Sequence, residues 1–303
     1  MKHPARLAIQ LLASIALMWV LLSHIGIEQV AARLTVQKPI AAGMAILLLS
    51  LQLVACMLRW RMVCTALGVR VPSSRLTLGW VGLGFALSQI LPSSIGGDGY
   101  RIVALGRRAG LADAARTVVA DRVAGLLTLS ALALPMSLAA IPGSRSSTAF
   151  GAFAIAAAAV LIAGLFAAAV TRVLARWTAS RLIRLVAADF GTMYSRATLL
   201  PVFAVSLAIH ALSISIVVCL AAALSLDEVP WWQAALAVPG TLLATALPVS
   251  LGGWGIRESS MVLALTSFGV SDAAALALSI TYGLAMVATA VIGVGLWLAG
   301  GHE

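Results

Sequence analysis

Residues 91–101 read LPSSIGGDGYR, and residues 247–257 read LPVSLGGWGIR, so the chain repeats one unusual sequence in its two halves. The two copies are identical at seven of their eleven positions, and each ends in an arginine that follows a cluster of glycines. Each copy also comes directly after a long apolar stretch. A glycine-rich break in an apolar segment, repeated in both halves, indicates a transport-type site near the middle of a membrane.

The composition predicts an integral membrane protein with one domain over residues 1–303. Hydrophobic residues make up 62% of the chain and charged residues only 10%, whereas soluble domains carry about 25% charged residues. The hydrophilic loops are too short to fold as a separate soluble domain. The net charge of +10 does not indicate nucleic-acid binding, because the basic residues lie in short loops between apolar segments, as orientation in a bilayer requires.

The apolar runs predict an all-α fold with about six full transmembrane helices and two re-entrant helical hairpins. The first helix has no small-residue cleavage site behind it, so we expect it to be retained. Arg59, Arg61, Arg70 and Arg75 are expected in a basic loop after the second helix. The six full spans are expected at about 7–27, 39–58, 119–140, 149–171, 199–224 and 272–299.

The distribution of basic residues predicts the orientation of the chain and of its hairpins. With a cytoplasmic N-terminus, fifteen Lys and Arg outside the two motifs fall inside, and only Arg33, Lys38 and Arg145 fall outside. Residues 76–108 cannot cross fully without inverting this asymmetry, so we expect a hairpin that enters from the cytoplasm and returns. An odd number of spans follows, so residues 233–268 should enter from the opposite face as an inverted repeat.

Each motif combines a helix break, a flexible backbone and a fixed cation. Pro92 and Pro248 interrupt helix hydrogen bonding, and the glycines permit tight turns. Arg101 and Arg257 are expected in the first turn of the returning half-helix, whose N-terminus attracts anions. An arginine fork there suits a lipid phosphate. The motif residues predicted to line this substrate site are Ser94, Gly96, Gly97, Gly99, Ser250, Gly252, Gly253 and Gly255.

Acidic residues near the arginines leave a second interpretation open. Arg257 could pair with Glu258 or with Asp98, and Arg101 could pair with Asp98 or Asp121. A structural ion-pair network, a snorkelling anchor and an anion site are therefore alternatives. A network that opens when a substrate phosphate competes would combine two of them. The Asp121-Arg122 pair is predicted to open the third span, as a helix cap and a headgroup contact.

Two further observations bear on the chemistry. His210 lies inside an apolar run, where a hydrogen bond between helices is a simpler interpretation than a proton relay. The sequence contains no nucleophile–base pair, metal-ligand spacing or nucleotide motif, so we expect neither an enzyme nor a cofactor. Transport would then be passive or coupled to an ion gradient, with Asp98, Asp121 and Glu258 as the acidic groups that could carry protons.

The sequence LPSSIGGDGYR, the Asp121-Arg122 pair and the sequence LPVSLGGWGIRE together resemble the transmembrane region of lysylphosphatidylglycerol synthases. The resemblance covers nearly the whole chain and implies a flippase-like domain. Full synthases add a soluble aminoacyltransferase domain, which is not expected here, so the resemblance does not imply aminoacyl transfer. One departure is Asp121, where the family pattern more often has glutamate.

The residues and the resemblance together predict that the protein moves or handles a polar-headed, phosphate-bearing lipid in a bacterial inner membrane. The expected partners are a membrane phospholipid or another polar-headed lipid, and a separately encoded lipid-modifying enzyme, but no nucleic acid. Two alternatives stay open. One is a secondary transporter of a small anionic solute, and the other is a membrane partner or enzyme subunit that acts on a lipid-linked substrate.

Overall fold

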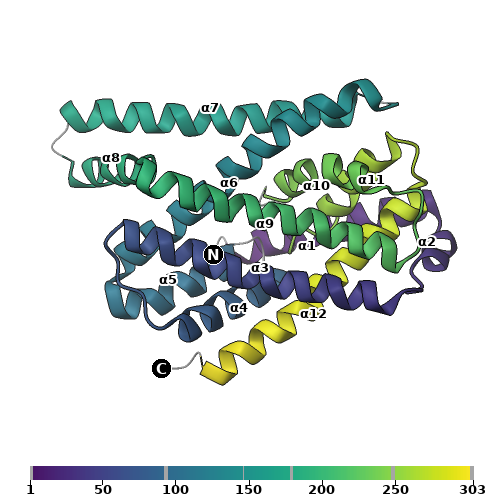
Figure 1. Ribbon diagram of the computed structural model, residues 1–303, viewed down its shortest axis with the longest axis horizontal. Coiled ribbons are helices and arrows are strands. Elements are labelled where there is room, and N and C mark those ends of the chain that lie inside the picture. Colours follow the sequence, from purple (N-terminus) through teal and green to yellow (C-terminus); the bar gives the residue numbers. More distant parts are fainter. Residues whose placement is uncertain (1–2, 92–94, 146, 178–179, 247–249, 301–303) are drawn as a thin grey trace.

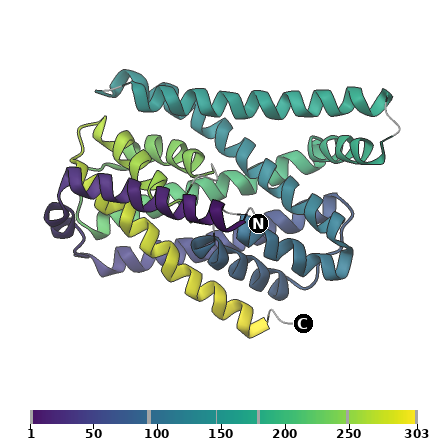
Figure 2. The same cartoon turned by 180° about the vertical axis from the view of Figure 1, so that it is seen from behind.

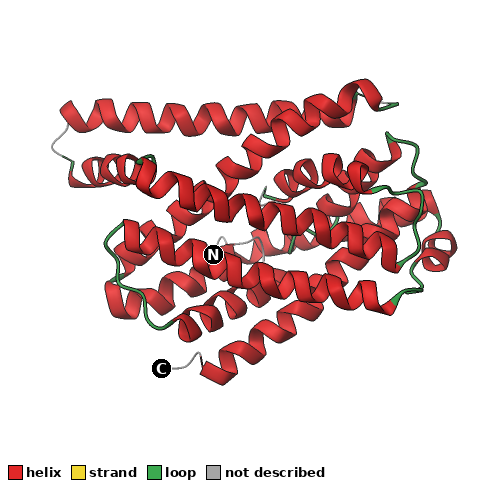
Figure 3. Cartoon of the chain, viewed as in Figure 1, coloured by secondary structure: helices red, strands yellow, loops and turns green. Residues whose placement is uncertain are grey.

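The computed structural model describes residues 3–91, 95–145, 147–177, 180–246 and 250–300, and the regular elements in these ranges are helices (Figure 3). The order of elements confirms the all-α prediction. The helices are α1 His3–Ile25, α2 Ile27–Arg33, α3 Pro39–Ala66, α4 Ser74–Ile90, α5 Ile95–Ala109, α6 Leu111–Ala140, the short 3₁₀ helix η1 Ile141–Gly143, α7 Thr148–Trp177, α8 Arg181–Met193, α9 Arg196–Ala223, α10 Trp231–Thr245, α11 Ile256–Thr266 and α12 Asp272–Gly300.

Five of the described helices are long and apolar enough to cross a membrane, and a bent pair can supply a sixth span. The five are α3, α6 with η1, α7, α9 and α12. The pair is α1 and α2, which meet at 90° where Gly26 adopts a φ of 92°. A positive φ of this size is accessible to glycine at little cost, so the chain can turn there. The predicted set of about six spans is confirmed.

The long helices α3 and α9 form the centre of the bundle (Figure 1). They are antiparallel, because the backbone N–H groups of Gln37 and Lys38, just before α3, donate to the carbonyl of Ala223 at the end of α9. Helix α7 packs on α6 along one edge of the molecule, and α12 crosses α4 on the other side (Figures 1 and 2). The helical bundle therefore has two ends, and we identify each end by the helix terminus that lies there.

The two predicted hairpins are helical pairs that enter the bundle from opposite ends (Figure 1). Helices α4 and α5 pack on each other and begin and end beside the C-terminal end of α3. Helices α10 and α11 also pack on each other, but they begin and end beside the C-terminal end of α9. Because α3 and α9 are antiparallel, the two pairs point towards each other. The tips of both pairs, residues 92–94 and 247–249, lie outside the described residues.

Apolar side chains divide between an internal core and the outer faces of the helices. The largest buried cluster includes Phe150 in α7, Leu220 in α9 and Leu278 in α12, all at most 1% exposed. By contrast, large apolar side chains such as Ile162 and Phe166 of α7 are about two-thirds exposed. Exposed apolar surface of this kind suits helices whose outer faces contact lipid tails.

Two boundary predictions are wrong, and buried ion pairing explains both. Arg59 was expected in a loop, but α3 continues to Ala66 and buries Arg59 to 8% exposure. Asp121 was expected to open a helix as its cap, but α6 already begins at Leu111, so Asp121 lies ten residues inside it. Arg59 and Asp121 are hydrogen-bonded to each other. Each therefore supplies the charge partner that allows the other to lie inside a bundle.

Candidate functional site

A cavity of about 560 Å³ lies between the two helical pairs and the central helices. One part of its wall is apolar, with side chains such as Phe85, Leu126 and Met286, and the other part is polar. Its charged side chains come from the first half of the chain. The polar side chains that line it are Gln52, Arg59, Ser88, Gln89, Asp98, Arg101, Asp121, Arg122, His210, Ser213, Thr245, Ser250 and Tyr282.

The described glycine-containing part of the first motif, residues 95–101, is helical rather than a loop, which corrects the prediction for these residues. Gly96, Gly97 and Gly99 lie in the first turn and a half of α5, and none has a positive φ. A Cβ added at Gly97 would collide with the carbonyl of Gly84 in α4. Glycine is needed at position 97 because two backbones meet there, not because the chain turns. As a result, Arg101 lies in the second turn of α5 and not in the first.

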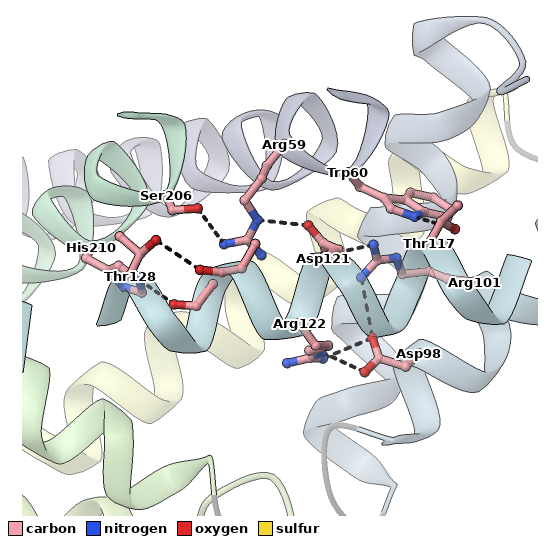
Figure 4. A network of polar contacts seen from close by, with 12 residues as sticks. Arg59, Trp60, Asp98, Arg101, Thr117, Asp121, Arg122, Thr128, Ser206 and His210 are labelled. Carbon is pink, nitrogen blue, oxygen red and sulfur yellow. Dashed lines mark hydrogen bonds and ion pairs between the residues drawn. The ribbon is translucent and has the colours of Figure 1, made fainter. Parts of the chain in front are cut away.

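The side chains of Arg59, Arg101 and Asp121 form a buried ion-pair network that joins three helices (Figure 4). One carboxylate oxygen of Asp121 accepts from Arg59 Nε at 2.8 Å, and the other accepts from Arg101 Nη2 at 2.9 Å. The Arg101 guanidinium also lies 4.2 Å from the centre of the Trp60 ring. Burial of these charges is tolerable because each has an opposite charge and a hydrogen bond.

A second pair extends the network towards the outside of the cavity. Asp98 accepts from Arg122 Nε at 2.6 Å and from Arg101 Nη1 at 3.4 Å (Figure 4). The Arg122 side chain is 49% exposed, whereas those of Asp98 and Arg101 are 15% and 10% exposed. Arg122 and Asp98 therefore lie at the mouth of the cavity, with Arg101 behind them. The contact between Arg101 and Asp98 is the longest in the network.

One face of α6 shapes the inner end of the network. Gly125 is one helical turn beyond Asp121, and a Cβ there would lie 2.7 Å from Nη1 of Arg59, so glycine makes room for the guanidinium. The carbonyl of Gly125 lies 3.3 Å from Nε2 of His210 on α9. The predicted hydrogen bond between helices at His210 is thus confirmed. Because a carbonyl only accepts, Nε2 carries the proton in this contact, and Nδ1 of the neutral imidazole is then an acceptor.

The second motif has the irregular backbone that was predicted for both. Gly252, Gly253 and Gly255 have φ values of 55°, 81° and 87°, which L side chains rarely adopt. A Cβ at Gly252 would lie 2.9 Å from the carbonyl oxygen of Gln89, at the end of α4. The described part of the second motif therefore touches the first helical pair. Helix α1 closes over it, because the Leu251 N–H donates to Ser14 Oγ at 3.0 Å.

Arg257 makes a different pair from Arg101. It is 2% exposed and donates from Nη2 and Nε to Glu258 Oε1 at 2.6 and 3.0 Å. Oε2 of Glu258 accepts from the Gly255 N–H at 2.6 Å and so caps the N-terminus of α11. Arg257 also lies 4.5 Å from the centre of the Trp254 ring. It does not line the described cavity, and its predicted contact with a headgroup stays a prediction.

The structure brings together much of the predicted site and adds residues that sequence reasoning missed. Asp98, Arg101, Asp121, Arg122 and the described cavity-lining motif residues Gly97, Ser250, Gly252 and Gly253 meet at one cavity, while Ser94 lies outside the described residues. Arg59, Gln89 and His210 were not assigned to the site. The available signal for Arg59 was that the apolar run continues beyond Arg59 and Arg61, over residues 62–69. Among the described residues, no group of three or more potential metal ligands gathers.

Comparison with known protein families gives a match over most of the chain. A family described as the lysylphosphatidylglycerol synthase TM region matches residues 7–293 of the 303 residues. The match spans both motifs, the Asp121-Arg122 pair and Arg59. No curated protein and no solved structure matches the chain.

Proposed function

Because the chain belongs to the family of lysylphosphatidylglycerol synthase TM regions, we propose that it moves a polar-headed, phosphate-bearing lipid between the leaflets of a bacterial inner membrane. The observation that carries this proposal is the cavity at the meeting point of two oppositely directed helical pairs, with arginines inside a bundle of apolar helices. Ionisable residues are rare inside membrane bundles and mark substrate pathways there.

The two walls of the cavity suit the two parts of a lipid. A headgroup phosphate needs donors that are held in place, which Arg101 and Arg122 offer. The glycerol and the first methylenes of the tails need apolar wall, which side chains such as Phe85, Leu126 and Met286 offer. A volume of about 560 Å³ falls within the range of about 300–1,000 Å³ that is typical of small-molecule sites.

Competition between Asp98 and a lipid phosphate for Arg101 supplies a mechanism by which a headgroup could enter the cavity. Arg101 holds Asp98 at 3.4 Å and Asp121 at 2.9 Å, and the longer contact is the easier one to exchange. A lipid phosphate that enters past Arg122 would take the place of Asp98 on Arg101, and the Arg101–Asp121 pair would remain. The helical pair α4–α5 could then rock against α10–α11, which would expose the cavity to one leaflet or the other.

The experiment is lipid translocation in proteoliposomes. Phospholipids labelled on an acyl chain are scored for access to a membrane-impermeant quencher, for the wild type, Arg101→Ala and Arg172→Ala. Arg172 is an exposed arginine of α7 outside the cavity, so it controls for loss of a guanidinium. We expect rapid access with the wild type and Arg172→Ala and at least about tenfold slower access with Arg101→Ala.

Two results would count against the proposal. If the wild type gives no more access than empty vesicles for any phospholipid, translocation of phospholipids fails. If the same vesicles instead take up a small anionic solute in a protein-dependent manner, the secondary-transporter alternative replaces the proposal of lipid translocation. Equal rates for Arg101→Ala and the wild type would keep translocation and remove Arg101 from the site. The variant Arg101→Lys keeps the charge and tests the site if Arg101→Ala does not fold.

A further inference from the structure

The charge of the cavity narrows the class of headgroup that it can accept. Its charged lining side chains are the three arginines Arg59, Arg101 and Arg122 and the two aspartates Asp98 and Asp121, so its formal charge is three minus two, or +1. The undescribed residues 92–94 and 247–249 carry no ionisable side chain. A headgroup with one negative charge would neutralise the cavity, whereas a cationic headgroup would raise its charge further.

Both carboxylates of the cavity are already committed to guanidinium groups. Asp121 accepts from Arg59 and Arg101, and Asp98 accepts from Arg101 and Arg122. Glu258, the nearest acidic residue of the second motif, is fully buried and holds Arg257 and the N-terminus of α11. Among the described residues of the cavity, no further carboxylate faces an incoming ammonium group. An ammonium group that entered would therefore lie near guanidinium groups, and the described residues of the cavity would offer it no carboxylate that is not already paired.

The polar atoms that remain unpaired match a phosphate and hydroxyl groups. Within the described structure, Arg101 Nε is a buried donor without a partner, and His210 Nδ1, Gln89 Oε1 and Ser250 Oγ are buried atoms without one. All four side chains line the cavity. A buried polar atom without a partner is costly, so it points to a water or a ligand that completes it. The donor suits a phosphate oxygen, and the neutral acceptors can accept from hydroxyl groups. Discrimination against an ammonium group therefore rests on the net charge of the cavity.

We propose that the cavity selects a lipid with a single phosphodiester charge and a neutral, hydroxyl-bearing headgroup, and that it rejects a headgroup that carries an aminoacyl cation. The inference rests on the proposed function, because it assumes that the cavity holds a headgroup. If this inference is correct, the protein does not transport a lysyl-modified lipid. In such a lipid, the two ammonium groups of the lysyl ester outweigh the phosphate and give a net charge of +1.

The first test compares phosphatidylglycerol with its lysyl ester in two assays. Binding is measured as the shift of the unfolding midpoint in detergent with short-chain forms of each lipid, and transport is measured in proteoliposomes with acyl-labelled forms. We expect phosphatidylglycerol to be bound and moved at least about tenfold better. Equal or better binding of the lysyl ester would overturn the inference. Selective binding of phosphatidylglycerol without transport of any lipid would overturn the proposed function and support the charge inference.

The second test removes the net positive charge of the cavity. Gln89→Glu adds a carboxylate to the lining and lowers the formal charge to zero, whereas Gln29→Glu makes the same change on the exposed face of α2. We expect Gln89→Glu to narrow the preference for phosphatidylglycerol by about tenfold and Gln29→Glu to leave it unchanged. The inference is overturned if the two variants keep the wild-type preference equally. Gln89→Leu, which removes the acceptor without adding charge, should weaken phosphatidylglycerol binding without favouring the lysyl ester.

Discussion

At the scale of single residues, Asp121 links its own helix to two others, and no pattern in the sequence predicts that it connects three helices. Its two oxygens bind guanidinium groups from two other helices, and its side chain is only 3% exposed. Removal of one member of a buried ionic group leaves its partners without compensation, which costs more than the pair itself contributes. The site is therefore built on a residue that the sequence assigned to a helix terminus.

Asp121→Asn should destabilise the protein strongly, because Arg59 and Arg101 would both stay buried without a carboxylate between them. We expect a loss of about 3–5 kcal/mol in unfolding free energy, read as a lower unfolding midpoint in detergent. Asp227→Asn is the matched control, since Asp227 is exposed in the segment before α10. A midpoint for Asp121→Asn equal to that of the control would show that the network does not stabilise the fold.

The sequence indicated Asp98 and Asp121 as possible partners of Arg101, and the structure pairs Arg101 with both. Sequence reasoning did not find Arg59 as the third member of the network, and the reason is distance along the chain. Arg59 and Asp121 are 62 positions apart, so no local periodicity links them. The beginning of α6 was missed in the same way. Arg116 made that segment look too polar for a helix of the bundle, but it donates to Asp189, 73 positions later in α8. Charges in apolar segments become interpretable only when their partners are known.

At the scale of elements, the two copies of one motif fold differently because of their surroundings. Gly97 is helical, since α5 packs directly on Gly84 of α4, while Gly252, Gly253 and Gly255 keep positive φ values beneath α1. Composition predicted the long spans well, because apolar length is a local property. It could not show which glycines serve turns and which serve helix crossings, because that depends on the neighbouring backbone.

Helix α4 crosses α12 at a pair of glycines, and this crossing should be sensitive to a single methyl group. A Cβ at Gly293 would lie 2.6 Å from the carbonyl oxygen of Gly82, whereas a Cβ at Gly295 on the same helix meets nothing within 4 Å. Gly293→Ala should therefore force the helices apart and cost about 1–3 kcal/mol. Gly295→Ala should be neutral or slightly stabilising. The measurement is the unfolding midpoint of the two variants, determined in parallel. Equal midpoints for Gly293→Ala and Gly295→Ala would contradict the close crossing of α4 and α12.

At the scale of the whole molecule, charge is distributed unequally between the two ends of the bundle. The end at the C-terminus of α3 contains Arg75, Arg107 and Arg116 and the basic ends of α7 and α8. The opposite end contains Asp227 and Glu228, with Glu228 paired to Arg33 at 3.3 Å. Because basic loops stay in the cytoplasm, we expect the first end to be cytoplasmic, along with both termini of the α4–α5 pair.

Labelling of single cysteines in intact cells tests this orientation. Arg107→Cys and Asp227→Cys, each placed in a chain without its three natural cysteines, put one exposed thiol at each end. An impermeant maleimide should label Asp227→Cys in intact cells and Arg107→Cys only after the membrane is opened. The prediction fails if Arg107→Cys is labelled from outside, or if both positions are labelled equally.

The bond between Arg59 and Asp121 also has a consequence for biosynthesis. Helix α3 leaves the ribosome with a buried arginine, whose insertion into lipid alone costs up to about 3 kcal/mol, and its partner is made 62 residues later. Until α6 has been made, the charge of Arg59 has no carboxylate partner in α6. We therefore expect α3 and α6 to meet while the protein is being assembled in the membrane, because Asp121 compensates the charge of Arg59 only when the two helices are in contact.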